Sequence, residues 1–374
     1  MQESVYRKVA ERLDMNITGV PKKAGDFSPA FLEYLELLYT PEEAKVASFL
    51  SVEPRRLTAE EVAERAGRPV EEIEPILGQM VEKGVALGFG GQYVLPVIPL
   101  LVNHHPFRDT EDEDTMKAGE LYQEFFIKDR FYKYYTSSAE GTPQRRAVPV
   151  DQSISGGQQV LSHEEIDTFL DQANMGAYSL APCPCRNRTE KMGIRECKDK
   201  YPVASCLFLG MPAMLTVGQG IARQVTREEV KKYIDEMREA GLVMMTDNTT
   251  EMKDGVVCFC CGCCCSTTRG LTRWDNPDAF ARSDFVAGVS DDCAACGTCV
   301  DRCFFRAISL SEGDDRAQID ESRCMGCGVC TVTCPTEALR LRRLERKPIF
   351  ATSRELRLKV ASENEATGQK RPLD

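Results

Sequence analysis

The sequence predicts an α+β protein with three successive parts: a helical N-terminal part, a central α/β part rich in cysteine, and a small C-terminal part also rich in cysteine. Three observations lead to this prediction. The first 182 residues contain no cysteine and carry helix caps and helical periodicity. All 18 cysteines then follow in dense groups. The last eight cysteines form two groups of four that have the same spacing.

The length of 374 residues exceeds that of one ordinary domain. From the changes in composition we expect domains at residues 1–110, 111–288 and 289–344. Residues 345–374 are charged and lack periodicity, so we expect an extended or disordered tail there.

Composition argues against several classes of protein. The formal net charge of −11 disfavours nucleic acid as a partner, because phosphate backbones attract basic surfaces. We find no run of 18 or more apolar residues, and the N-terminus is charged, so we expect no membrane insertion, no secretory signal and a cytoplasmic location. Dense local cysteine clusters in such a chain indicate thiolates that bind metal rather than a disulfide framework.

Three helices are expected in the first 50 residues. One lies near Val5–Leu13, and a second covers the apolar-rich segment Ala30–Tyr39. A third begins at Pro41, a residue that suits the first helical position.

A more specific pattern follows. The capping box Thr58–Glu61 opens a short helix, a second helix spans Val70–Lys83, and short strands at Val85–Leu87 and Tyr93–Val97 flank a glycine-rich turn. This order of elements resembles the winged-helix fold, over roughly residues 30–100. The resemblance implies either a DNA-binding domain or a module for docking or dimerisation.

Charge decides between these two roles. The helix that would enter the major groove carries one lysine against four glutamates, Glu71, Glu72, Glu74 and Glu82. These carboxylates would be repelled by phosphates, and the helix has no arginine to read guanine edges. We therefore expect a homo- or hetero-oligomer contact through this domain and no nucleic-acid partner.

Helices and a strand lead into the cysteines. The pattern at Met116–Ser138 predicts an amphipathic helix, and we expect its many aromatic residues to lie in the hydrophobic core. A strand is predicted at Ala177–Ala181. The capping box Thr226–Glu229 opens another helix, which ends at Gly241.

The strongest signal is a C-x-x-C-x-x-C-x-x-x-C spacing that occurs twice near the C-terminus. Three cysteines on one tight loop can bind three irons of a [4Fe–4S] cluster, and in a duplicated motif each fourth cysteine serves the other cluster. Cluster 1 is thus expected on Cys293, Cys296, Cys299 and Cys334, and cluster 2 on Cys324, Cys327, Cys330 and Cys303. This pattern resembles the bacterial dicluster ferredoxin over about Ser290–Leu341. Phe304 departs from it, because proline commonly follows the fourth cysteine.

The ten central cysteines form two further groups. We expect a third cluster on Cys183, Cys185, Cys197 and Cys206. The denser run supplies further candidate ligands, at Cys258, Cys260, Cys261, Cys263, Cys264 and Cys265. Neighbouring side chains diverge, so these six cannot all point at one metal. A cluster shared between the two groups and a zinc site both remain open.

Arginines flank both central groups, at Arg186, Arg188, Arg269 and Arg273. Near anionic clusters they would stabilise the thiolates and raise the reduction potential, and otherwise they are surface charges.

The C-terminal half resembles a family of anaerobic 4Fe-4S binding proteins that combine CxCR, a CCxCCC stretch and a dicluster end. The resemblance implies an iron–sulfur electron carrier, or a subunit of an anaerobic oxidoreductase, with at least two clusters and unidentified redox partner proteins. No general base, nucleophile or cofactor loop is identifiable, so we expect an electron-transfer component rather than an independent catalyst. The alternatives are a redox-sensing winged-helix regulator and an enzyme with a substrate-binding open cluster in the central domain.

Overall fold

The computed structural model describes residues 4–108, 113–150, 153–154, 164–344 and 349–366. They divide into two compact units. The N-terminal unit comprises Met1–Glu140, Asn187–Ile194 and Val360–Asp374, and the cysteine unit comprises Gly141–Arg186 and Arg195–Lys359. The boundary expected at residues 110 and 111 lies outside the described residues. Within the described ranges, no helix is long and apolar enough to cross a membrane.

The first helices lie where the sequence predicted them. They are α1 (Val5–Leu13), α2 (Pro29–Leu38) and α3 (Pro41–Ala47). Helix α2 begins because the Ser28 side chain accepts a hydrogen bond from a backbone N–H of the first turn, and proline follows at the first helical position. A hairpin of β1 (Lys22–Lys23) and β2 (Asp26–Phe27) precedes α2.

Two more helices and a small sheet follow. Helices α4 (Ala59–Ala66) and α5 (Val70–Lys83) each end at a glycine in the left-handed conformation, where a side chain would be strained. The sheet has the order β3-β5-β4 and is antiparallel. Its strands are β3 (Leu57–Thr58), β4 (Leu87–Phe89) and β5 (Gln92–Val94), followed by α6 (Ile98–Leu101).

The sequence predicted one helix over the aromatic segment Met116–Ser138, but the structure divides this segment into several pieces. Helix α7 (Glu113–Tyr122) continues as a π-helical stretch, Gln123–Lys128, and then stops at Arg130, which has a positive φ of 62°. A short helix, α8 (Tyr132–Thr136), follows. The prediction of an aromatic core is confirmed, because Tyr122, Phe125, Phe126 and Phe131 are buried.

Part of the expected tail forms a helix, which corrects the prediction of an extended or disordered segment. Helix α15 spans Ser353–Ala366. In the N-terminal unit, the Asn364 side chain donates to the Ile17 carbonyl at 3.1 Å, and Ser138 hydrogen-bonds Glu363. Tertiary contacts therefore hold this helix, although its sequence lacks a periodic apolar face. Residues 345–348 and 367–374 lie outside the described residues.

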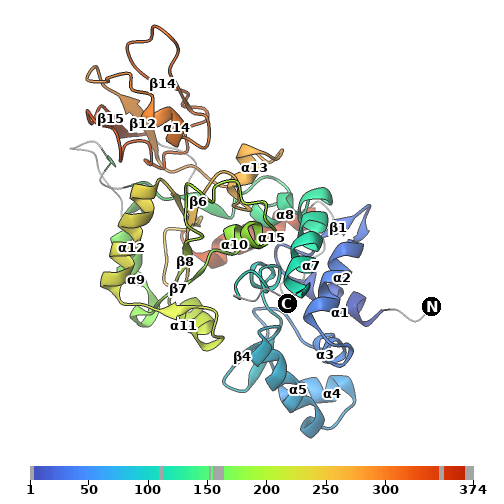
Figure 1. The fold of residues 1–374 in the computed structure, drawn as a ribbon. Helices are drawn as coiled ribbons and strands as arrows, with labels where there is room; N and C mark the ends of the chain where they lie inside the picture. The colour runs from blue at the N-terminus through green and yellow to red at the C-terminus, as the bar shows by residue number, and fades with distance from the viewer. Residues whose placement is uncertain (1–3, 109–112, 151–152, 155–163, 345–348, 367–374) are drawn as a thin grey trace. The chain divides into compact units, whose positions relative to one another are not determined.

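The cysteine unit is built on a six-stranded sheet, of which Figure 1 labels β6, β7 and β8. The strand order is β6-β10-β11-β8-β7-β9. Its strands are β6 (Arg145–Ala147), β7 (Tyr178–Pro182), β8 (Ser205–Leu209), β9 (Arg223–Gln224), β10 (Val243–Asp247) and β11 (Gly255–Cys260). Every neighbouring pair is antiparallel. The sequence predicted an α/β arrangement, whereas antiparallel pairing makes this part α+β as well.

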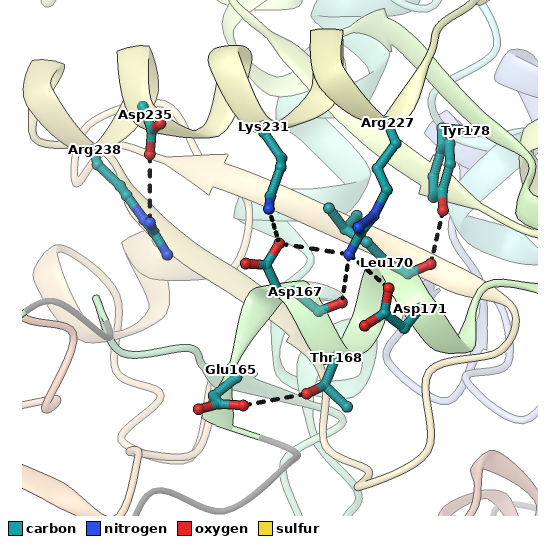
Figure 2. Close-up of polar contacts among 10 residues, drawn as sticks. All are labelled: Glu165, Asp167, Thr168, Leu170, Asp171, Tyr178, Arg227, Lys231, Asp235 and Arg238. Atoms are coloured by element: carbon teal, nitrogen blue, oxygen red, sulfur yellow. Dashed lines mark hydrogen bonds and ion pairs between the residues drawn. The ribbon is translucent and has the colours of Figure 1, made fainter.

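Two helices, α9 (Ile166–Gln172) and α12 (Arg227–Ala240), cover one face of this sheet. Their apolar side chains share one core with those of β8 and β10. Figure 2 shows the polar edge of the contact, where Arg227 bonds Asp171 at 2.6 Å and Lys231 bonds Asp167 at 3.1 Å. These pairs are partly exposed, so apolar packing rather than charge orients the two helices.

Helix α12 provides a test of local stability. Thr226 and Glu229 form the reciprocal capping box that the sequence predicted. We expect Thr226→Ala to lower the free energy of unfolding by about 1 kcal/mol, because one backbone N–H loses its partner. Anaerobic denaturant titration measures the loss. The exposed Glu236→Ala serves as the control and should change stability by less than about 0.5 kcal/mol. Equal effects of the two variants would contradict the prediction.

Helix α11 (Met211–Gly218) contacts the opposite face of the sheet, where Thr216 and Ser179 hydrogen-bond at 2.9 Å. The other short helical segments are the 3₁₀ turn Asn174–Gly176, α13 (Thr268–Thr272) and α14 (Thr298–Arg302). Helix α10 (Pro184–Lys191) is divided between the two units after Arg186.

The C-terminal part contains two pairs of short antiparallel strands. Strand β12 (Phe285–Val289) pairs with β15 (Leu339–Arg343), and β13 (Ile308–Ser309) pairs with β14 (Gln318–Ile319). Apolar side chains of this part pack against those of β6 and β10. Arg302 also donates to the carbonyls of Arg238 and Glu239 at the C-terminal end of α12, where a cation is favoured.

Candidate metal centres

Two pockets in the C-terminal part are each lined by four cysteines. Cys293, Cys296 and Cys299 line one of them together with Cys334, which comes from the second copy of the motif. The other is lined by Cys324, Cys327, Cys330 and Cys303. The β12–β15 pairing brings the two ends of the segment together, which explains the exchange of the fourth cysteine. We call these the outer and the inner set.

The inner set is the more buried of the two. Burial raises the pKa of Cys327 to about 12 and that of Cys330 well above its usual range. The backbone N–H of Ala307 points at the Cys303 sulfur at 3.3 Å. In the outer set, by contrast, Cys296 is exposed, and a hydrogen bond with Thr298 lowers its pKa. Both sets fit a cluster, because metal charge offsets the cost of burying four thiolates.

Phe304, the departure from the ferredoxin pattern, packs against the central cysteine run. Its ring lies 5.9 Å from that of Tyr201, edge to face. A Cβ at Gly262 would come within 3.0 Å of the Phe304 side chain, so the glycine leaves room for the ring. The position that proline would occupy therefore serves to pack the C-terminal part against the sheet.

Strand alternation separates the central cysteines. Along β11, Cys258 and Cys260 point to the face that packs against the C-terminal part, whereas Phe259 points to the face covered by α9 and α12. Cys261 continues the alternation just beyond the strand and joins the Phe259 side. On β8, Cys206 lies next to Cys258, with their sulfurs 3.8 Å apart.

One group, which we call the tetrahedral set, comprises Cys197, Cys261, Cys263 and Cys264. Its four Sγ atoms all lie within 4.8 Å of one another, which no other group of potential ligands achieves among the described residues. Four of the separations are 4.0, 3.7, 3.7 and 3.6 Å. Hydroxyls that the sequence did not single out hold the loop: Thr268 donates to the Cys261 carbonyl and Thr272 to that of Gly262, both at 2.6 Å.

The other six central thiols form one group of neighbouring sulfurs, which we call the six-thiol ring; the sulfurs of Cys206 and Cys258 lie 3.8 Å apart and those of Cys260 and Cys265 lie 3.2 Å apart. Going round it, the members are Cys183, Cys206, Cys258, Cys260, Cys265 and Cys185. Ser266, which the sequence did not single out either, donates its backbone N–H to the Cys185 sulfur at 3.4 Å. The sequence placed Cys197 with Cys183, Cys185 and Cys206; in the structure it lies in the tetrahedral set instead.

Ionisation within the ring is uneven. Its interaction with Cys185, together with burial, raises the pKa of Cys183 to about 12. Interactions with Cys183 and Cys258, together with burial, hold the pKa of Cys206 well above its usual range. Interactions with Cys206 and Cys260 lower the pKa of Cys258 far below that range. These six neighbouring sulfurs, four of them in buried residues, therefore cannot all ionise together unless a metal supplies positive charge.

Arg186 lies between the two groups. Its side chain is 1% exposed and donates to the carbonyls of Val203 at 2.6 Å and Phe259 at 2.8 Å. Burial opposes its charge, but the electrostatic interactions with the sulfurs of Cys183 and Cys261 outweigh that effect and raise the pKa of the guanidinium. Arg186 thus stays charged beside both groups.

The other three arginines are placed differently. Arg188 belongs to the N-terminal unit, where its guanidinium lies 3.4 Å from the centre of the Tyr122 ring. Arg269 stacks on Trp274 at 4.3 Å. Arg273 forms an ion pair with Glu196 at 2.5 Å, and its pKa is raised by that pair and also by the thiolates of Cys263 and Cys264.

The two four-cysteine sets, each completed by a cysteine from the other copy of the motif, define an iron–sulfur domain of the dicluster ferredoxin type. Residues 289–338 match the family described as the 4Fe-4S dicluster domain. A stretch of 64 residues is 34% identical to the archaeal-type glutamate synthase [NADPH] of Dehalococcoides mccartyi. It covers 17% of this chain and 13% of that protein. No solved structure matches the chain. These findings support an iron–sulfur electron-transfer role.

Proposed function

We propose that this chain is an electron-transfer component of an oxidoreductase, with clusters on the inner and outer sets and a third on the six-thiol ring. When bound, such clusters take up and release single electrons. One observation carries the proposal: Cys327 of the inner set belongs to the same buried apolar cluster as Cys260 and Cys265 of the ring, and the partly buried Cys303 packs against that cluster. The ring and the inner set are therefore neighbours in a core that excludes water.

The outer set supplies the exchange point with a partner protein. Cys296 is exposed, and Asp291 and Asp292 beside the loop are exposed as well. Asp291 pairs with Arg316, and Asp292 adds an exposed negative charge beside the cluster, which favours a redox partner with a basic docking surface. The exposed outer set, the inner set and the buried ring then follow one another from the surface into the cysteine unit.

We assign the winged-helix-like segment to docking or dimerisation. The four glutamates of α5 are all exposed, so its free face is acidic and unsuited to DNA. From the archaeal-type glutamate synthase [NADPH] we carry over only the dicluster domain, because the chain spans 13% of that relative.

Iron content tests the proposal. Protein purified without oxygen should contain about twelve irons per chain, four for each of three clusters. The double variant Cys206→Ala/Cys258→Ala removes two neighbours in the ring and should retain about eight irons, with the ferredoxin-type spectrum intact.

Cys197→Ala is the matched control, because this cysteine lies in the tetrahedral set and its loss should leave the iron content unchanged. Wild-type protein with only about eight irons, or a double variant that keeps all twelve, would rule out a cluster on the ring.

A further inference from the structure

The tetrahedral set differs in kind from the other cysteine groups. Four ligands placed about 2.3 Å from one zinc ion at tetrahedral angles lie about 3.8 Å from one another. The separations of 3.6 to 4.0 Å in this set agree with that value. The thiolates of a [4Fe–4S] cluster each bind a different iron and must stand farther apart.

We infer that Cys197, Cys261, Cys263 and Cys264 bind a single zinc ion, separate from the iron–sulfur clusters. Four cysteines leave no coordination position for water or substrate, which is typical of a structural zinc site. Cys197, Cys261 and Cys264 are buried and Cys263 is partly exposed, so the site is closed on most sides.

Charge around the set fits this occupant. One zinc ion with four thiolates carries a net charge of about −2. Arg186 lies near Cys261, and Arg273 lies near Cys263 and Cys264. Two guanidinium groups thus balance the excess negative charge, as outer partners of metal ligands commonly do.

The zinc ion would join distant segments of the cysteine unit. Cys197 follows α10, whereas the other three ligands follow β11, and Phe304 of the C-terminal part packs on Gly262 between two of them. The metal therefore holds the loop against which the inner set is packed. This role does not depend on a third cluster, so the two proposals can fail separately.

Two adjacent cysteines, Cys264 and Cys265, allow the zinc site to be tested separately from the six-thiol ring. Elemental analysis of full-length protein should find about one zinc per chain beside the iron. Cys264→Ala should lose the zinc and keep the iron, whereas Cys265→Ala, whose thiol lies in the six-thiol ring, should keep the zinc. Cys263→His should retain zinc, because three cysteines and one histidine also form a structural site.

Zinc-edge X-ray absorption of the wild-type protein gives a readout that needs no variant. We expect four sulfur neighbours at about 2.3 Å and no metal neighbour. Wild-type protein without zinc would overturn the inference, as would a mononuclear iron spectrum that Cys264→Ala abolishes. Loss of about four irons from Cys264→Ala would also overturn it, because the set would then hold a cluster.

Discussion

We expect Cys303→Ala to lose about four irons per chain, and to lose them from the set that includes Cys327 rather than from the set that includes Cys296. The physical reason is placement. Cys303 follows the first motif in sequence, but its side chain lines the inner pocket, at the boundary with the central sheet. Without this thiolate one iron of the inner cluster has no ligand, and the cluster should not survive purification.

Spectral matching identifies which cluster is lost. Electron paramagnetic resonance of the reduced protein should give the same residual signal for Cys303→Ala as for Cys327→Ala. Cys334→Ala is the reciprocal control, and its signal should match that of Cys296→Ala. If Cys303→Ala matched Cys296→Ala instead, each motif would hold its own cluster and the exchange of the fourth cysteine would be wrong.

The second large effect is expected at Arg186. Replacement by glutamine leaves the carbonyls of Val203 and Phe259 without their donor and the neighbouring thiolates without a cation. Breaking such a buried charge interaction typically costs about 3–5 kcal/mol of stability. The loss of positive charge should also lower the reduction potential of a cluster bound in the six-thiol ring.

Arg188→Gln is the matched control, two positions along the chain. Arg188 is buried too, but its contacts lie in the N-terminal unit, so the variant should lose stability without a change of potential. Anaerobic denaturation and redox titration measure the two effects, and Arg186→Lys should recover part of each. The same change of potential in Arg188→Gln and Arg186→Gln would contradict the placement of Arg186 between the thiol groups.

Local signals in the sequence predicted many of the elements. The capping boxes at Thr58 and Thr226 and the helix Val70–Lys83 lie where expected, because caps, glycine stops and apolar periodicity act within a few residues. The dicluster domain could be predicted for a similar reason, since its tight loops require a fixed cysteine spacing. Arg130, whose positive φ ends the aromatic segment, gave no such signal, and neither did the tail helix α15.

The sequence by itself determined that the central cysteines outnumber the ligands of one metal, and that some must diverge. Only the tertiary structure decided how they divide. Closeness in the chain groups Cys197 with Cys183 and Cys206, but distance along the chain does not determine which face of a sheet a side chain occupies. The antiparallel register of β11 with β8 sets Cys258 beside Cys206, and the two-residue alternation turns Cys261 to the other side. Strand pairing is a long-range interaction, so no local pattern of cysteines could have specified it.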